Sequence, residues 1–285
     1  MKQAAFFDRT SRGRLIVTGR DRKDLLHRLC TNDVASLKEG ESRATCFCNR
    51  KGLLIDWSVV IDRGEDILIL TANPQRLSGH IQQYTITEDV TVRNYMALEL
   101  VVCGPDAAEV LGVELEESRH ETRRLAEVEV LIARIEPLWT DGYAVLAPDA
   151  VALRRLLAKD AKALDVAEID ELRIRSGMPA FPNEINESRN PWEAALEDSI
   201  SMAKGCYVGQ EVVARLKTYN KVKKRLVGLQ LEGPFSVGAM LSLDSEEVGE
   251  VTSLSGDVAL GYLHLEHSEP GTQLDRAKIV ALPMS

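Results

Sequence analysis

Residues 204–215 read KGCYVGQEVVAR and place a lone thiol, Cys206, just before a predicted helix over Gln210–Thr218. The free N–H groups at a helix start carry partial positive charge, and Lys204 adds a full charge two residues away. Both favour the thiolate, which is the nucleophilic and metal-binding form of cysteine. The alternative is a structural cysteine, a small buried side chain in a turn, because no His or Asp partner can be assigned from sequence.

A second candidate is Asp56, which lies in the otherwise apolar stretch KGLLIDWSVVI beside Trp57. A carboxylate inside a buried strand needs a partner or has a raised pKa, and such a group can act as a general base. Strand alternation could instead turn this side chain to solvent.

The third candidate is the basic segment Arg215–Arg225 (RLKTYNKVKKR), which holds six cations and no acid. Such a segment could bind a ligand rich in carboxylate or phosphate groups. Alternatively it is a solvated linker whose lysines discourage edge pairing by the strand that follows.

The elements around these residues alternate between strands and helices. Arg14–Thr18 is a predicted strand, and Asp21 is a predicted cap for a helix with Leu25, Leu26 and Leu29 on one face. Further strands are predicted over 44–48, 53–61, 66–72, 98–103, 127–135 and 143–146, and helices after Pro74, Pro105 and Pro148. Asn73 is a predicted cap, and the charges after Glu114 are a predicted solvated loop. The pattern indicates an α+β fold, and it contains neither GxGxxG nor GxxxxGK[ST].

The carboxy-terminal part has a different sequence pattern, with a loop-like segment followed by short predicted strands. Residues 177–191 are rich in Pro, Asn and Gly and predict a loop. A helix is predicted from Asn190-Pro191, with Glu193 completing a capping box. From Arg225 onward, short strands separated by Gly, Pro and Asp predict a small antiparallel β-barrel. These features predict an α+β region over 1–216, with two subdomains, and a barrel domain over 217–285.

Composition narrows the class of protein. The chain has 285 residues, 45% of them hydrophobic, and a net charge of −9, which argues against direct nucleic-acid binding. The start lacks the apolar run of a signal peptide, and no apolar run is long enough to span a bilayer. Five cysteines without a CxxC pair predict neither a disulfide framework nor a metal site. We expect a reduced cytoplasmic protein without a membrane partner.

The motif K-G-C-Y-x-G-Q-E, with Arg215 and the strand RLVGL after it, closely resembles the YgfZ-type family of the aminomethyltransferase (glycine-cleavage T-protein) superfamily. Other segments resemble this family along the whole chain. They are TNDV at 31–34, KG at 51–52 followed by Asp56, SGMP at 176–179, PWE at 191–193, GEVTS at 249–253 and LGYL at 260–263.

The resemblance implies an aminomethyltransferase-like fold, a ring of subdomains with mixed and antiparallel sheets around a central folate site, plus the barrel. It implies that Cys206 is functionally required. The motif residues that shape its surroundings are Lys204, Gly205, Tyr207, Gly209, Gln210, Glu211 and Arg215. The implied folate-binding residues are Asp56, Trp57, Asn32, Arg175 and Arg225. T-proteins carry a second acid where Ile55 stands and a glutamate where Arg175 stands.

The function that this resemblance implies is a folate-binding accessory protein that supports maturation or repair of iron–sulfur proteins, including tRNA-modifying enzymes. Its cofactor is tetrahydrofolate or a derivative, and an iron–sulfur cluster is expected only transiently. Its partners are folate and iron–sulfur client or assembly proteins. One alternative is a tetrahydrofolate-dependent aminomethyl- or methyltransferase in which Asp56 is catalytic. Another is a non-catalytic docking protein.

Overall fold

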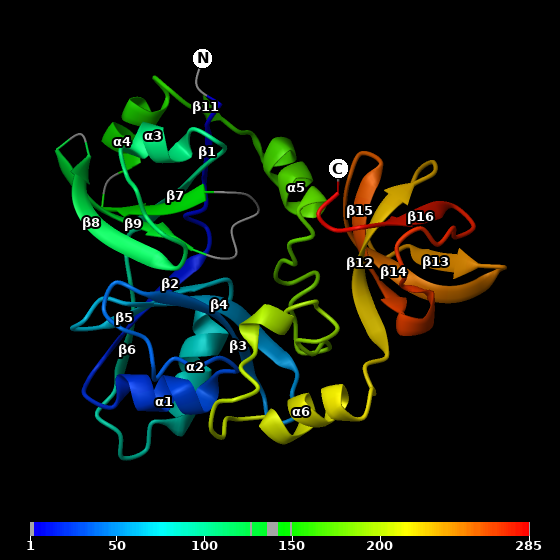
Figure 1. Cartoon of the computed structure of the whole chain (residues 1–285), viewed down its shortest axis with the longest axis horizontal. Helices are drawn as coiled ribbons and strands as arrows, with labels where there is room; N and C mark the ends of the chain where they lie inside the picture. The colour runs from blue at the N-terminus through cyan, green and yellow to red at the C-terminus, as the bar shows by residue number, and fades with distance from the viewer. Residues whose placement is uncertain (1–2, 126, 136–141, 149, 285) are drawn as a thin grey trace. The chain divides into compact units, whose positions relative to one another are not determined.

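The computed structural model describes residues 3–125, 127–135, 142–148 and 150–284. The chain divides into two compact units (Figure 1). The amino-terminal unit comprises Met1–Cys48, Ile55–Leu164 and Asp198–Val208. The carboxy-terminal unit comprises Asn49–Leu54, Asp165–Glu197 and Gly209–Ser285. The boundary between 216 and 217 stays a prediction.

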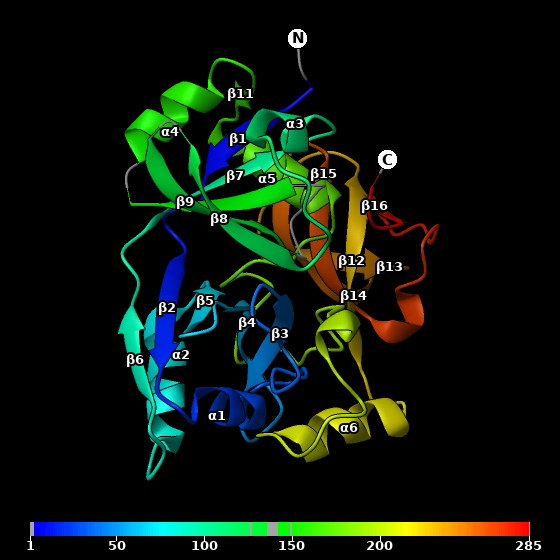
Figure 2. The same ribbon diagram turned by 60° about the vertical axis from the view of Figure 1, so that its left-hand side comes forward.

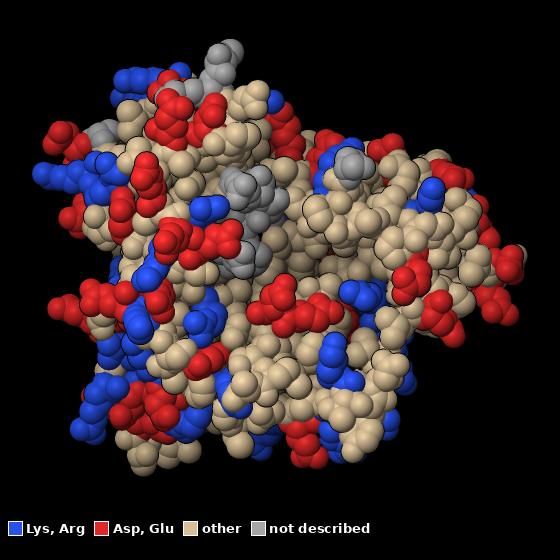
Figure 3. Space-filling model, in the orientation of Figure 1, with Lys and Arg blue, Asp and Glu red and all other residues tan. Residues whose placement is uncertain are grey.

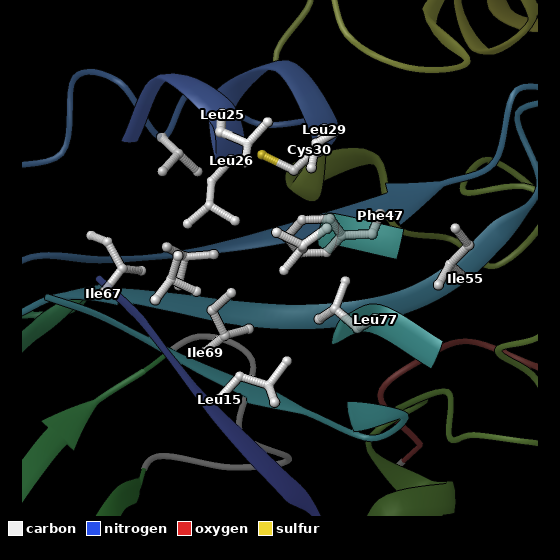
Figure 4. Packing of buried hydrophobic residues seen from close by; sticks show 14 of the residues in the cluster. Leu15, Leu25, Leu26, Leu29, Cys30, Phe47, Ile55, Ile67, Ile69 and Leu77 are labelled. Atoms are coloured by element: carbon white, nitrogen blue, oxygen red, sulfur yellow. The ribbon is translucent and has the colours of Figure 1, made fainter. Parts of the chain in front are cut away.

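One five-stranded sheet carries Asp56 in the amino-terminal unit. Its strand order is β3-β4-β5-β2-β6, and β2 pairs antiparallel with both β5 and β6. Helices α1 and α2 cover one face, where the leucines of α1 point at the sheet around Phe47 (Figure 4). The bounds are β2 Gly13–Thr18, α1 Arg22–Leu29, β3 Ser42–Cys48, β4 Leu54–Asp62, β5 Ile67–Thr71, α2 Pro74–Tyr84 and β6 Thr91–Asn94.

A six-stranded sheet, in the order β11-β1-β7-β10-β9-β8, packs against the other face of the first sheet. Helices α3 and α4 cover its far face, so the unit has four layers, helix–sheet–sheet–helix (Figure 2). The bounds are β1 Ala5–Asp8, β7 Leu98–Cys103, α3 Ala107–Leu111, β8 Arg119–Leu125, β9 Val128–Arg134, β10 Gly142–Ala147, α4 Ala150–Leu157 and β11 Lys162–Ala163. Two sheets that both bury their inner face confirm the α+β class.

Two details of the predicted elements are wrong. The charged stretch after Glu114 is not wholly a loop, because Arg119–Leu125 forms edge strand β8 and pairs along its length with β9. β8 is an edge strand, and the side chains of an edge strand can be polar. Its sequence therefore lacks the alternating hydrophobic residues from which a strand is predicted. Asp21 and Asn73 occupy the N-cap positions of α1 and α2, but neither side chain makes a capping hydrogen bond. Asp21 accepts instead from the backbone N–H of Asp89 at 2.8 Å.

The carboxy-terminal unit contains the predicted antiparallel barrel. Its five strands curl into a half-barrel in the order β13-β14-β15-β12-β16 around an apolar core. On the outer face, Ile174 of α5 packs against Leu226, Leu260 and Tyr262. The bounds are α5 Val166–Arg175, α6 Gln210–Thr218, β12 Lys224–Leu231, β13 Met240–Leu243, β14 Glu246–Ser255, β15 Val258–His264 and β16 Ala277–Val280, with short 3₁₀ turns at Glu197–Ser199 and Leu265–His267.

The helix predicted from Asn190 is absent, although its capping hydrogen bonds form. Asn190 Oδ1 accepts from the N–H groups of Trp192 and Glu193, both at 3.1 Å, and Glu193 reaches back to Asn190 N at 3.2 Å. The chain then leaves the helical region at Ala195, whose φ is +55°. A capping box therefore closes a single turn here, because a non-glycine residue in the left-handed region ends helix propagation.

Within the described residues, no helix is both long and apolar enough to cross a bilayer. Charge is unevenly distributed within the carboxy-terminal unit. The β13–β14 hairpin carries the acidic residues Asp244, Glu246 and Glu247. Red acidic side chains are gathered at the right-hand edge of Figure 3. The basic segment Arg215–Arg225 precedes this acidic barrel in the chain.

Candidate functional site

The loop that carries Cys206 is anchored at both ends on the amino-terminal unit. Ser201 N donates to Thr31 O at 3.0 Å, and Val208 N donates to Arg28 O at 3.0 Å. Both acceptors lie in or just after helix α1. The loop is therefore held to the carboxy-terminal end of a helix that the first core fixes in place.

Lys204 supplies a third anchor in the middle of this loop. Its ammonium donates to the carbonyl oxygens of His27, Cys30 and Asn32, at 2.7 Å for Cys30 and 3.0 Å for Asn32. The last carbonyls of a helix lack intrahelical partners and attract cations. Burial lowers the pKa of Lys204, and the neighbouring Asp33 opposes this lowering. The motif lysine thus pins the loop to α1.

Replacing Lys204 by methionine is expected to destabilise the protein by about 1.5–3 kcal/mol, because hydrogen bonds from a charged donor are lost and carbonyls stay desolvated. Urea unfolding of the variant, compared with Lys51→Met at an exposed lysine, measures this effect. Equal stability of the two variants would show that the lysine does not hold the loop.

Cys206 itself is exposed, whereas Cys30, Cys46, Cys48 and Cys103 are buried. The interpretation of Cys206 as a small buried side chain is therefore wrong. Its neighbour Tyr207 is buried, and the Lys204 ammonium lies 5.1 Å from the centre of that ring. The loop thus turns the tyrosine inward and leaves the thiol accessible.

The two motif glycines differ in what they demand. Gly209, the N-cap of α6 in the carboxy-terminal unit, has a φ of +83°, and an added Cβ would lie 2.5 Å from Asn49 O. An added Cβ on Gly205 would meet no atom within 4 Å. The backbone therefore explains glycine at 209 and does not explain it at 205.

Gly209→Ala is expected to cost at least about 1 kcal/mol of unfolding free energy, because alanine resists the left-handed region and contacts backbone. Gly205→Ala is the matched control and is expected to leave stability within about 0.5 kcal/mol. Chemical denaturation of both variants tests the pair, and equal losses would contradict the assignment.

The remaining motif residues lie on α6. Glu211 and Arg215 form an exposed i,i+4 pair at 3.3 Å, which contributes little to stability, and Gln210 opens the helix half-buried. Five of the six cations of the basic segment are exposed and Lys224 is half-buried. Lys217 stands over the Trp192 ring at 5.0 Å.

Asp56 is fully buried, so the alternative in which strand alternation turns it to solvent is wrong. Its Oδ2 accepts hydrogen bonds from Ser58 at 2.7 Å and from Thr71, while its Oδ1 has no partner among the described residues. Burial raises the pKa of this carboxyl, and the hydroxyls of Thr71 and Ser58 and the Arg12 guanidinium oppose that effect. A buried carboxylate with one oxygen that lacks a hydrogen-bond partner can accept a proton, or a hydrogen bond from an N–H group.

Asn32 and Trp57 meet the same short segment in the amino-terminal unit. Trp57 Nε1 donates to Ser199 Oγ at 2.9 Å, and Asn32 Nδ2 donates to Asp198 O at 3.3 Å and to Ala44 O at 2.9 Å. The structure therefore brings these two residues together around Asp198–Ser199. Their side-chain donors are already engaged.

Arg175 and Arg225 belong to the carboxy-terminal unit and have acidic neighbours there. Arg175 Nε donates to Glu171 at 2.8 Å on α5, and Arg225 lies 3.9 Å from Glu197. Both pairs are partly exposed, so either arginine can exchange its partner for a ligand carboxylate at small cost. Within the part of the chain that the structure describes, no group of three or more His, Cys, Asp or Glu side chains could hold a metal ion.

Two buried ionic networks were missed from sequence. In the carboxy-terminal unit, Glu184 is fully buried and bonds Arg173, Ser253 and the N–H of Ala180. In the amino-terminal unit, Glu99 is held by Arg9 and Arg14. Their partners lie up to 90 residues apart, and no local pattern could pair them.

Family models match both parts of the chain. Residues 1–204 match the GCVT N-terminal domain, and residues 223–283 match the CAF17 C-terminal beta-barrel domain.

Similar proteins include two aminomethyltransferases and one putative transferase. An aminomethyltransferase of Rubrobacter xylanophilus is 30% identical and matches over 91% of this chain and 74% of its own length. An aminomethyltransferase of Halalkalibacterium halodurans is 28% identical over 99% of this chain and 86% of its own. A chloroplastic Arabidopsis thaliana protein is 28% identical over 91% of this chain, which spans only 65% of that protein's length.

The solved glycine cleavage system aminomethyltransferase T from Bartonella henselae superposes with a TM-score of 0.87, covering 99% of this chain and 86% of that one. At 22% sequence identity this likeness concerns the fold. The fold is that of the aminomethyltransferase superfamily. Within it, the match to both domains shows that the chain belongs to the YgfZ/CAF17 family.

Proposed function

We propose that this protein binds a reduced folate and supports maturation or repair of iron–sulfur proteins, tRNA-modifying enzymes among them, through the thiol of Cys206. The proposal is supported by the amino-terminal match to the GCVT domain and the carboxy-terminal match to the CAF17 barrel. The folate part is also supported by two of the reported relatives, which are named aminomethyltransferases. Tetrahydrofolate or a derivative is the proposed cofactor.

The observation that carries the proposal is the accessibility of Cys206. It is the one exposed thiol of five, and it lies on a loop fixed by Ser201, Lys204 and Val208. A fixed loop presents the sulfur at a defined place without ordering cost when a client protein arrives. A thiolate there can form a transient bond, accept a sulfur or one-carbon unit, or ligate a passing cluster.

Cys206→Ser is therefore expected to fail to restore the activity of an iron–sulfur enzyme in cells that lack this protein. Ala203→Ser, at an exposed position of the same loop, is the matched control and should restore it. Because Cys206 is exposed, serine there should change stability by less than about 0.5 kcal/mol. Full rescue by Cys206→Ser would remove the thiol from the proposal.

A second candidate is a tetrahydrofolate-dependent aminomethyl- or methyltransferase, and it is favoured by Asp56. A buried carboxyl with an unmet oxygen and a raised pKa is suited to general-base work. This candidate predicts turnover of folate with an amine donor, sensitivity to Asp56→Asn and indifference to Cys206→Ser. Retained function in both variants would leave the docking-protein alternative.

A further inference from the structure

A buried ionic cluster lies where the chain passes from the six-stranded sheet at β1 to the five-stranded sheet at β2. Arg9 and Arg14 are 6% and 8% exposed, and Glu99 is fully buried. Arg9 Nε donates to Glu99 Oε1 at 2.7 Å, and Arg14 Nη1 donates to Glu99 Oε2 at 3.4 Å. One buried carboxylate is therefore shared by two buried guanidinium groups.

The two sheets of the amino-terminal unit hold this cluster between them. Arg14 is two residues before Ile16 on β2, so both side chains lie on the face that packs against the six-stranded sheet. Glu99 on β7 pairs with Leu146 of β10, which packs in the same layer between the sheets. The connection from β1 to β2 closes the cluster, because the Thr10 hydroxyl accepts from Glu99 N at 3.0 Å and Thr10 O accepts from Arg14 Nη2 at 3.0 Å. The fold therefore fixes the positions of these charged groups.

Two donors of this segment have no acceptor. Arg14 Nε is buried and has no hydrogen-bond partner among the described residues. Arg12, whose backbone N–H donates to Arg9 O at 3.0 Å, has a half-buried side chain with a second buried Nε of this kind. No hydrogen bond or ion pair joins the Arg12 side chain to any residue that the structure describes. A guanidinium group only donates, so these N–H groups need an acceptor from elsewhere.

The charges of the cluster do not balance. Burial, then Arg9, lower the pKa of Arg12 to about 10, so Arg12 remains a cation at neutral pH. Asp8, the acid at the end of β1, pairs with Arg154. Asp56 is a further carboxyl that raises the pKa of Arg12, and counting it with the shared glutamate still leaves three arginines against two carboxylates. A desolvated cation without a countercharge is costly, so this segment favours an anion.

We propose that the segment 9–14 is an anion-binding subsite, in which the unpaired donors of Arg12 and Arg14 hold a carboxylate or phosphate group of a ligand. Guanidinium groups bind such oxyanions through charge-assisted hydrogen bonds. A water molecule can accept these hydrogen bonds but leaves the excess positive charge uncompensated. The subsite goes beyond the proposed function, because it requires an anionic group and not a particular molecule.

The NMR signals of arginine Nε–H groups report on this subsite. The Arg14 signal is assigned from its own backbone amide, and the Arg12 signal by its loss in Arg12→Gln. Inorganic phosphate or acetate is expected to shift the Arg14 signal to saturation in wild type, with an affinity at least about tenfold weaker in Arg12→Gln. Arg20→Gln, at an arginine that is 81% exposed, is the control and should bind like wild type. The inference is overturned if neither anion gives a saturable shift, or if Arg12→Gln binds as tightly as wild type.

A stability measurement separates this role from a structural one. In buffer without phosphate or carboxylate, Arg12→Gln is expected to melt no lower than wild type, because it removes a cation that has no paired countercharge. Added phosphate should raise the melting temperature of wild type more than that of the variant. A variant that melts below wild type without the anion, and gains as much from phosphate, would mark Arg12 as merely structural.

Two sources can supply the anionic group, a carboxylate of the folate glutamate or a separate small anion. If 5-formyltetrahydrofolate shifts the Arg14 signal and competes with phosphate, folate carries the group. If folate binds without competing, the anion belongs to a second ligand. Saturable phosphate binding at Arg14 in a protein that binds no folate would overturn the folate proposal and leave the anion subsite intact.

Discussion

Glu184→Ala is expected to destabilise the carboxy-terminal unit by about 3–5 kcal/mol, because it removes one partner of a buried ion pair. Glu184 is fully buried. Its carboxylate accepts hydrogen bonds from Ser253 Oγ at 2.7 Å, Ala180 N at 2.9 Å and Arg173 Nη1 at 3.4 Å. Alanine would leave the buried Arg173 without its buried countercharge. Urea unfolding followed by tryptophan fluorescence measures the loss.

Two further variants define what is lost at this position. Glu184→Gln keeps the shape and one acceptor oxygen but no charge, so its loss should fall between wild type and alanine. Glu187→Ala, at an exposed glutamate of the same loop, should cost less than about 1 kcal/mol. If Glu184→Ala and Glu187→Ala unfold at the same urea concentration, the hydrogen bonds and ion pair of Glu184 do not stabilise this loop.

Asp56→Asn is expected to weaken folate binding by at least about tenfold, because a hydrogen bond to a charged acceptor contributes about 1.5–3 kcal/mol. The same variant should gain stability relative to wild type as pH rises. The folded pKa of Asp56 is raised by burial, so its contribution to stability is complete below the unfolded carboxyl pKa and is lost as pH rises through the folded pKa. Asparagine does not titrate, so the variant does not lose this stability as pH rises.

Thermal unfolding at several pH values tests the second part without a ligand. The melting temperature of Asp56→Asn minus that of wild type should become more positive between pH 4 and pH 8. Asp244→Asn, at an exposed hairpin aspartate, is the control and should show no such trend. A difference that is constant with pH would mean that the buried carboxyl does not gain a proton on folding.

The fold was largely predictable because its elements carry strong local signals. The leucines of α1 at helical spacing, the proline at the start of α2 and the apolar run of β4 each predict the element that forms. Edge strand β8 lacked this signal because its polar side chains face solvent. The turn at Asn190 carried the signal of a helix start, and only the backbone at Ala195 shows that no helix follows.

The site was predictable where function lies in a short motif. Gly209 and the exposed Cys206 both belong to KGCYVGQE, which is local in sequence. The role of Lys204 was not predictable, since its acceptors lie more than 170 residues earlier in the chain. The charge of Lys204 was expected to favour the thiolate of Cys206. In the structure, its ammonium instead donates hydrogen bonds to carbonyl oxygens at the end of α1. Asp56 was found as an acid in an apolar strand, but its burial and its hydrogen bond from Thr71 depend on how β4 and β5 lie in the folded sheet.

The most direct test is calorimetric titration of the purified protein with tetrahydrofolate and with 5-formyltetrahydrofolate, in wild type and in Cys206→Ser. Micromolar binding by both proteins is the predicted result, and it would separate the folate site from the thiol. Absence of binding in both would contradict the central claim and favour the docking-protein alternative.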